Sequence, residues 1–297
     1  MVVSAPLIEM LRKAQNGGFF KEPISNLTHH IVGYAYVDDT DLIDVDMRDD
    51  KRHLDDAAAS MQEAIHRWEG GLKATGGAIR PDKSWVYAIG FDFDAQGKWH
   101  YKPNVAEEYK FKVRDHKNNL KQMDTMEVHE GKETLGVFLA PDGNNDAMID
   151  YLKSKAEHWN ELVHTGHLSR NDARRALSTT IMKSIEYGLN ALTLSRNDCK
   201  TIMKPILDAG LTNMGVCRNF PRGVAYGPVE EGGLGIPDIY TTQGTGRIAT
   251  LVENIGSDSL LGELLRTSIE AAKVEIGVGR DLFSLDYPTY SPILTDC

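Results

Sequence analysis

The sequence contains little cysteine, no long apolar run and no excess of positive charge. Its three cysteines, Cys199, Cys217 and Cys297, are too few and too scattered for a disulfide framework or a CxxC metal site, so we expect reduced, structural thiols. No stretch approaches the roughly 18 to 20 apolar residues that a membrane span needs, and the first residues lack the basic-then-apolar layout of a signal peptide. We therefore expect an intracellular protein, in the nucleus or the cytoplasm, with no membrane partner.

The charge balance is acidic. Lys and Arg number 33 against 43 Asp and Glu, a net charge of -10, which excludes a nucleic-acid binder that is strongly basic overall. A hydrophobic fraction of 41% excludes a disordered chain. Residues 38–56 hold nine aspartates against three Lys and Arg residues, and a solvated loop and helix face explains most of them. The pair at the start of this run needs another explanation.

Hydrophobic periodicity predicts helices and hairpins in the first 145 residues. Apolar residues at helical spacing predict a helix over 6–14 and another from Leu54 to Leu72, with Gly70-Gly71 and Gly76-Gly77 marking its end. Residues 31–45 place β-branched and aromatic residues around Asp38-Asp39, which predicts a hairpin with the acidic pair at its tip.

Turn signals predict two further β features in this part of the chain. The turn at 94–97 separates the aromatic-rich segments 85–93 and 98–101, which favours a second hairpin. Residues 134–139 read as one further strand that ends at the turn 141–144. Together these features indicate an α+β fold over 1–145.

From Asp146 onward the pattern is helical. The tetrapeptide Ser-Arg-Asn-Asp occurs at 169–172 and at 195–198, and each copy resembles a capping box, so we expect helices over about 170–192 and 196–209. Residues 231–237 form a breaker-rich connection, the helical pattern returns over 245–265, and the last twenty residues are expected to be extended or frayed. One apolar stripe comprises Met148, Leu152, Ala156, Trp159 and Val163.

The segment Tyr36-Val37-Asp38-Asp39 is the most informative feature of the sequence. Two adjacent carboxylates repel each other unless a cation neutralises them. Mg²⁺ takes oxygen ligands and usually bridges one or two carboxylates to substrate phosphates, and in two-metal phosphoryl transfer a pair of such ions stabilises the attacking and leaving oxygens. Acidic pairs are also common in ordinary turns, so the tetrapeptide by itself leaves both interpretations open.

This hairpin resembles the third motif of the palm domain of reverse transcriptases, an aromatic-x-Asp-Asp hairpin. The resemblance implies that Asp38 is the metal ligand, that Asp39 is its weaker partner, and that Tyr36 lies beside the nucleic acid. Residues 75–84 are similar to the fourth motif, a Gly-rich turn before a Lys and a Ser or Thr. By this resemblance Lys83 protonates the leaving pyrophosphate; a solvent-exposed lysine after a turn is the competing interpretation.

Two later segments resemble the same family, in its non-LTR retrotransposon form. Residues 133–139 look like the Leu-Gly strand near which the primer is gripped, with Leu135 and Gly136 as the matching residues. Residues 231–237 are similar to the Gly-Gly-Leu-Gly-x-Pro segment after the thumb. The resemblance spans roughly residues 2–250.

The resemblance has consequences for the fold and the partners. It implies a partial palm of antiparallel hairpins plus helix over 1–145, an all-α thumb-like region over 146–225, and a C-terminal helical extension with a frayed tail over 226–297. It also implies Mg²⁺ (or Mn²⁺), deoxynucleoside triphosphates, an RNA template and a DNA primer.

The palm is incomplete in this sequence. The family needs another Asp on the strand beside the hairpin, and a second motif that positions template and nucleotide, both before the third motif. The 35 residues before Tyr36 contain no Asp. Asp41, Asp44 and Asp46 belong to the same hairpin and are unsuited to replace it. We therefore expect the carboxyl-terminal part of a reverse transcriptase that does not polymerise by itself.

Two alternatives remain: a non-catalytic nucleic-acid-binding module, and a decayed retroelement remnant. Basic residues cluster in the predicted helices and, with Trp159, suit a nucleic-acid groove. Interleaved acids, among them Glu157 and Glu161, equally favour a mixed-charge solvated face. The basic residues are Lys153, Lys155, Arg170, Arg174, Arg175, Lys183, Lys200 and Lys204.

Other metal sites find little support. Residues 142–153 have the start of a calcium loop, but Ala147 and Lys153 stand where that loop needs Gly and Glu. His158, His164 and His167 lie close together in the sequence without a nearby Cys, so we interpret them as surface or capping residues. Walker, GxGxxG and GxSxG patterns do not occur.

Overall fold

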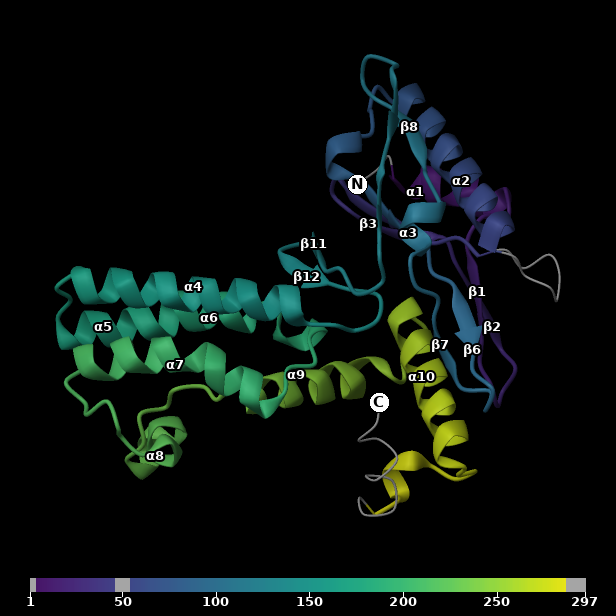
Figure 1. The fold of residues 1–297 in the computed structure, drawn as a ribbon. Coiled ribbons are helices and arrows are strands. Elements are labelled where there is room, and N and C mark those ends of the chain that lie inside the picture. The colour runs from purple at the N-terminus through teal and green to yellow at the C-terminus, as the bar shows by residue number, and fades with distance from the viewer. Residues whose placement is uncertain (1–3, 46–53, 287–297) are drawn as a thin grey trace. The chain divides into compact units, whose positions relative to one another are not determined.

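The computed structural model describes residues 4–45 and 54–286 (Figure 1). Asp46, Cys297 and the end of the expected frayed tail lie outside the described residues. The chain divides into two compact units: unit 1 joins the chain up to Glu127 with the part from Leu251 onward, and unit 2 is Val128–Thr250. These units do not follow the expected boundaries at 145 and 225, because residues 128–145 group with the helices that follow them.

The two helices predicted for the start of unit 1 are confirmed as α1 (Ser4–Lys13) and α2 (Leu54–Ala74). The prediction that Gly70-Gly71 marks the end of α2 is wrong. A Cβ on Gly71 would lie 2.4 Å from Leu7 Cδ2, so this glycine lets α1 approach α2 closely instead of ending the helix. The chain leaves the helix at Gly76, where φ is +83°. The two helices share a buried cluster of Leu7, Leu11, Val32, Ala64 and Trp68.

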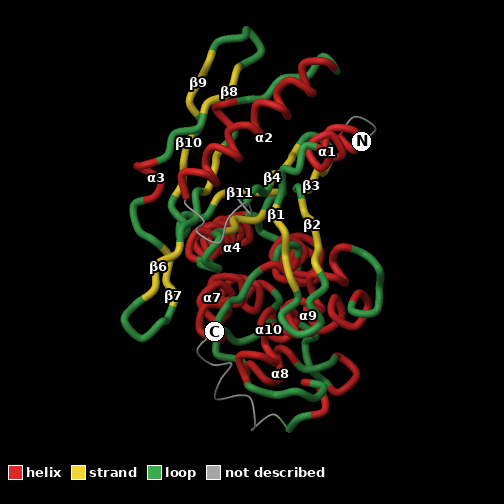
Figure 2. The backbone as a smooth tube through the Cα atoms, turned by 90° about the vertical axis from the view of Figure 1, so that its right-hand side faces the viewer, coloured by secondary structure: helices red, strands yellow, loops and turns green. Residues whose placement is uncertain are grey.

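Among the described residues, the strands of unit 1 pair two by two, as the short yellow pairs in Figure 2 show. The predicted hairpins around 38–39 and 94–97 are confirmed, but residues 85–87 form a separate strand with a parallel partner. The antiparallel pairs are β1 (Gly18–Lys21) with β2 (Thr28–Ile31), β3 (Gly33–Tyr36) with β4 (Asp39–Leu42), β6 (Phe91–Phe93) with β7 (Trp99–Tyr101), and β8 (Lys112–Arg114) with β9 (Leu120–Gln122); β5 (Trp85–Tyr87) and β10 (Asp124–Met126) run parallel.

A second buried cluster lies between α2 and the later strands of unit 1. Its members come from α2, from β5 and β8, and from the short helix α3 (Val105–Glu108). It comprises Ile65, Val86, Ala88, Val105, Phe111, Val113 and Met123.

Unit 2 begins with a hairpin of β11 (Lys132–Thr134) and β12 (Val137–Leu139). The single strand expected over 134–139 is therefore wrong in part, because Leu135 and Gly136 form a two-residue turn with φ of +51° and +80°. Positive φ at both central residues is the type I′ pattern, whose twist matches that of the flanking strands.

The helices of unit 2 follow the predicted pattern. The predicted helix over 170–192 is α5 (Arg170–Ala176), a π-helical turn (Leu177–Ile181), α6 (Met182–Glu186) and a 3₁₀ turn (Leu189–Ala191). The helix predicted from 196 begins as expected but extends to Asn213. Ser195 and Asp198 form a full capping box. At the other copy, the Ser169 side chain accepts a hydrogen bond from the Asp172 amide, but the full box is not formed. The remaining helices are α4 (Asp146–Thr165), α7 (Arg196–Asn213) and α8 (Arg222–Tyr226).

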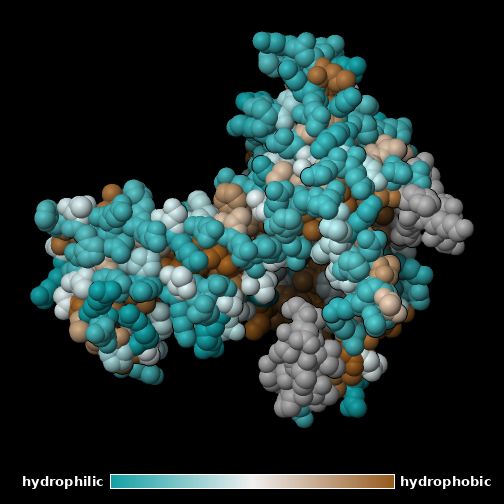
Figure 3. All heavy atoms as spheres, viewed as in Figure 1, coloured by the Kyte–Doolittle hydropathy of each residue, from teal (hydrophilic) through white to brown (hydrophobic). Residues whose placement is uncertain are grey.

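One large core holds unit 2 together. The predicted stripe on α4 is buried, from Met148 to Val163. It packs against α7 and the α5–α6 helix, which lie beside α4 in Figure 1, through side chains such as Ile185 and Ile202 with no exposed surface. Hydrophilic residues cover most of the face shown in Figure 3.

Two helices close the chain. The helical stretch expected over 245–265 is α9 (Ile239–Asn254) and α10 (Leu260–Ile276), separated by residues 255–259. The described chain ends beyond a 3₁₀ turn at Leu282–Ser284. None of the described helices is long and apolar enough to cross a membrane.

Candidate metal and nucleic-acid sites

The β3–β4 hairpin places the acidic pair at its tip. Tyr36 pairs with Asp39, which leaves Val37 and Asp38 as a two-residue turn. Val37 has φ of +57° while Asp38 has a negative φ, the combination of a type II′ turn. A positive φ is an outlier for a β-branched residue, and such strain clusters at functional sites. The turn therefore exposes two adjacent carboxylates on a strained backbone.

One face of this hairpin is acidic and aromatic. Tyr34 lies opposite Asp41, and Tyr36 lies opposite Asp39, so all four side chains share a face. The four residues are exposed, with Tyr36 at 64%. On the other face, Leu42 packs against the cluster between α1 and α2, which fixes the orientation of the hairpin.

The carboxylates of β4 interact electrostatically. Partial burial of its carboxyl group, and then the charge of Asp39, raise the pKa of Asp41. Burial first, and then the charge of Asp41, raise the pKa of Tyr34. Asp39 and Asp41 thus repel each other, and a bound cation would relieve that repulsion.

Asp44 has a different role. Its carboxylate accepts hydrogen bonds from Asn16 Nδ2 at 3.1 Å, from the Gly17 amide at 3.1 Å and from Ser60 Oγ at 2.9 Å. These bonds tie the end of the hairpin to the loop after α1 and to α2. Asp44 is therefore a structural residue, a role that the sequence analysis did not predict.

The fourth-motif segment forms a short 3₁₀ turn, Pro81–Lys83, after α2. Ser84 Oγ donates to the Arg80 carbonyl at 2.9 Å, and Arg80 pairs with Asp82 at 2.6 Å. Lys83 is exposed at the end of this turn. Among the described residues, no hydrogen bond or ion pair joins Lys83 to the β3–β4 hairpin, so the structure does not bring the two together.

Within residues 4–45 and 54–286, no group of three His, Cys, Asp or Glu side chains is arranged to hold a metal ion. Asp38 and Asp39 are both exposed. His158, His164 and His167 are exposed, as expected.

A groove of about 430 Å³ in unit 2 lies beside the Leu135-Gly136 turn. Tyr187 donates its hydroxyl to the Leu135 carbonyl at 2.9 Å and is 69% exposed. Lys155 Nζ lies 5.0 Å from the centre of the Tyr151 ring. The lining residues are Gly136, Met148, Tyr151, Lys155, Lys183, Ser184 and Tyr187.

Sequence reasoning missed the aromatic part of this groove. Tyr151 precedes Lys155 by four residues, and Lys183 precedes Tyr187 by four, so each pair lies on one helix face or at its end. That repeated spacing was a signal in the sequence. Lys183 also pairs with Glu186 at 2.6 Å.

Other residues predicted for a nucleic-acid surface lie elsewhere. Arg174 and Arg175 are exposed on α5, and neither lines the groove. Assigning Trp159 to such a surface is wrong, because the residue is only 8% exposed and belongs to the core. Its indole donates to Thr180 Oγ1 at 3.3 Å within the bundle.

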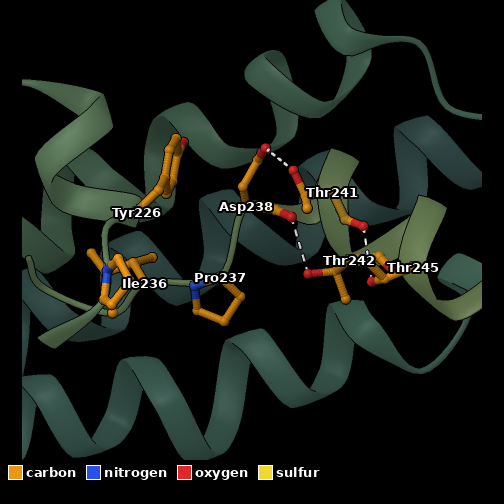
Figure 4. Close-up of a pocket in the computed structure, with 9 residues that line it drawn as sticks. Tyr226, Ile236, Pro237, Asp238, Thr241, Thr242 and Thr245 are labelled. Carbon is orange, nitrogen blue, oxygen red and sulfur yellow. Dashed lines mark hydrogen bonds between the residues drawn. The ribbon is translucent and has the colours of Figure 1, made fainter. Parts of the chain in front are cut away.

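The segment 231–237 borders a second pocket, of about 370 Å³ (Figure 4). Asp238 accepts hydrogen bonds from Thr241 Oγ1 at its carboxylate and from Thr242 Oγ1 at its carbonyl, at the start of α9. A Cβ on Gly233 would lie 2.1 Å from the Gly227 carbonyl oxygen, so only glycine fits there. Local packing and helix capping thus account for this segment.

Comparison of the chain with known protein families, with curated proteins and with solved structures gives no match.

Proposed function

We propose that the chain is the carboxyl-terminal part of a reverse transcriptase, in which Asp38 and Asp39 contribute to a Mg²⁺ (or Mn²⁺) site for nucleotidyl transfer. The supporting observation is the strained two-residue turn at Val37-Asp38, which presents both carboxylates to solvent while Leu42 anchors the hairpin to the core. A bound divalent ion would supply positive charge for the nucleotide phosphates. By the same resemblance, Lys83 would protonate the leaving pyrophosphate.

The metal site needs a further ligand. In the described part of the chain, the β3–β4 sheet has two strands and the outer edge of β3 is unpaired. A strand that pairs at this edge and brings another carboxylate would complete a two-metal site. We therefore propose that this polypeptide alone binds the ion weakly and does not extend a primer.

Metal binding tests the proposal directly. Titration of the full chain with Mn²⁺, followed by paramagnetic broadening of amide NMR signals, should broaden residues 36–41 first. Asp38→Asn should remove this broadening. Asp92→Asn makes the same change on an exposed strand of the β6–β7 hairpin and should leave it intact. Equal broadening in wild type and Asp38→Asn would refute the metal assignment, and primer extension by the chain alone would refute its incompleteness.

A nucleic-acid-binding module is the second candidate, and the groove beside the Leu135-Gly136 turn favours it. Lys155 and Lys183 supply positive charge for phosphates, while the exposed Tyr187 ring offers a surface on which a base can stack. This function does not require the acidic hairpin.

Binding to a primer–template duplex, measured by fluorescence anisotropy at several salt concentrations, tests the module. Lys155→Ala should weaken binding and reduce the salt slope by about one. Tyr187→Phe should retain most of the stacking that Tyr187→Ala loses. The exposed Lys200 on α7 lies outside the groove, so Lys200→Ala serves as the control. An equal effect of both lysine changes would indicate non-specific attraction only.

A further inference from the structure

Helix α10 is attached to the rest of unit 1 with few fully buried residues of its own. Gly262 is its only buried residue, and none of its described apolar side chains belongs to a buried cluster of unit 1. Leu261 and Val274 are 44% and 57% exposed. The other apolar side chains of α10, among them Leu264, Leu265 and Ile269, are at most partly buried, so polar contacts supply a share of the attachment.

The centre of the attachment is His29 on β2. Its side chain is 10% exposed and lies between two carboxylates. Nε2 is 2.8 Å from Glu22 Oε1, in the loop after β1, and Nδ1 is 3.1 Å from Glu263 Oε2 on α10. Glu22 is 2% exposed, and Ser25 Oγ donates to its second oxygen.

Further contacts join α10 to the same loop. Glu270 Oε2 accepts hydrogen bonds from the backbone amides of Ile24 at 2.9 Å and Ser25 at 3.0 Å. Arg266 donates to two carbonyls before α10, and its charge helps to stabilise ionised Glu22. The charged groups in contact with His29 are thus two carboxylates, Glu22 in the loop after β1 and Glu263 on α10.

The protonation state of the ring decides whether these contacts are favourable. A neutral imidazole has one donor nitrogen and one acceptor nitrogen, whereas ionised carboxylates only accept. A neutral His29 would direct a lone pair at either Glu22 or Glu263. Only the doubly protonated ring donates to both, and such charge-assisted bonds are stronger than neutral ones.

We propose that His29 is a proton-operated latch, which fastens α10 to the β1–β2 hairpin while its ring is doubly protonated and releases the helix when the ring becomes neutral. The geometry of the three side chains supports the latch, which does not depend on the proposed polymerase function.

The sign of the pH dependence follows from the partners. Attachment that needs a doubly protonated imidazole between two carboxylates is favoured at low pH and weakens as the pH rises. Hydrogen bonds from Ser25 and then His29 lower the pKa of Glu22 against the opposing effect of burial. Glu22 therefore stays ionised to a lower pH than an ordinary glutamate.

Hydrogen exchange of the full chain, read by mass spectrometry, tests the latch. After correction for the intrinsic pH effect, peptides from 260–276 should exchange at least about tenfold faster at about pH 8 than at about pH 5.5, relative to peptides from α4. His29→Gln should abolish this difference. His100 lies on β7 opposite Asp92 and has no described hydrogen bond or ion pair with α10, so His100→Gln changes a histidine that faces a carboxylate outside the latch and should preserve the difference.

Glu263→Gln provides a second, sharper variant at a partly exposed position. Its amide can donate to a neutral ring, so α10 should remain attached at both pH values and the dependence should flatten. Glu263→Ala should instead release α10 at both. An unchanged pH dependence in His29→Gln or in Glu263→Gln would overturn the latch, as would exchange of α10 that does not vary with pH in the wild type.

Discussion

Unit 1 and unit 2 differ in how their elements are held. One cluster of 24 buried residues holds unit 2, whereas unit 1 divides its core into clusters of seven and five. The strands of unit 1 pair two by two, and the aromatic side chains of β6 and β7 remain largely exposed, with Phe93 at 71%. Local contacts therefore matter more in unit 1, where the acidic hairpin and the His29 latch both lie.

This difference bears on function. Segments with few buried contacts open locally at low free energy, and binding or switching elements often come from them. The groove of unit 2 stands on the larger core, with Met148 at its floor. The two candidate functions thus rely on different scaffolds: a groove on a large core in unit 2, and a hairpin anchored to a small cluster in unit 1.

The largest expected effect comes from the core of unit 2. Ile202 has no exposed surface, so Ile202→Ala should lower the free energy of unfolding by about 3 to 4 kcal/mol. Hydrogen exchange in increasing urea reports each unit separately and should show the loss in unit 2 peptides alone. The 55% exposed Leu162 provides the control, and Leu162→Ala should have little effect. An equal loss in unit 1 peptides would show that the units unfold together.

A smaller effect is expected from adjacent glycines of α2 in unit 1. Gly71→Ala would bring a Cβ to 2.4 Å from Leu7 Cδ2 and should destabilise unit 1 by about 1 to 2 kcal/mol. Gly70 has open space around it, so Gly70→Ala should stabilise the helix by up to about 1 kcal/mol. The same exchange experiment compares both changes. A stabilising Gly71→Ala would mean that α1 moves aside easily.

Much of the local structure was predictable because it depends on short-range signals. The stripe from Met148 to Val163 follows the helical period, and Ser195 with Asp198 forms the expected box. The tip of the β3–β4 hairpin followed from residue types on both sides of Asp38 and Asp39. These signals involve neighbours in the sequence, so no knowledge of packing was needed.

The predictions were wrong where tertiary contacts determine the role of a residue. The sequence suggests that Gly71 breaks the helix, yet the close approach of Leu7 explains why a glycine stands there. Trp159 was considered for a nucleic-acid groove, but it packs in the core with the rest of its apolar stripe. The bond between Tyr187 and Leu135 and the pairing of His29 with Glu263 join residues far apart in the sequence, which no local pattern encodes. The metal assignment of Asp38 and Asp39 stays a prediction.

The two Ser-Arg-Asn-Asp copies permit a comparison within unit 2. Ser195→Ala removes a bond in a full capping box and should lower stability by about 1 kcal/mol. Ser169→Ala also removes its two hydroxyl bonds with Asp172, but at a cap whose amide bond is longer, 3.3 Å against 3.1 Å, and it should have a smaller effect. Urea denaturation of both variants measures the difference. Equal losses would indicate that the bond from the Ser195 amide to the Asp198 carboxylate does not strengthen the bonds of the Ser195 hydroxyl.

The smallest expected effect concerns a polar link in unit 1. Tyr109 donates to Asp55 at 2.7 Å, and this bond, with burial and nearby acidic charges, raises the pKa of Tyr109 to about 12. A raised pKa means that the link stabilises unit 1 below the ordinary tyrosine range, about pH 10, and is lost as the pH approaches 12. Absorbance at the tyrosinate band should therefore show a late ionisation step that Tyr109→Phe removes.

Because the side chain is partly solvated, Tyr109→Phe should reduce stability at neutral pH by less than about 1 kcal/mol. If the late step persists in Tyr109→Phe, another tyrosine holds its proton more tightly, and the link between α2 and the loop after α3 is weaker than its geometry indicates.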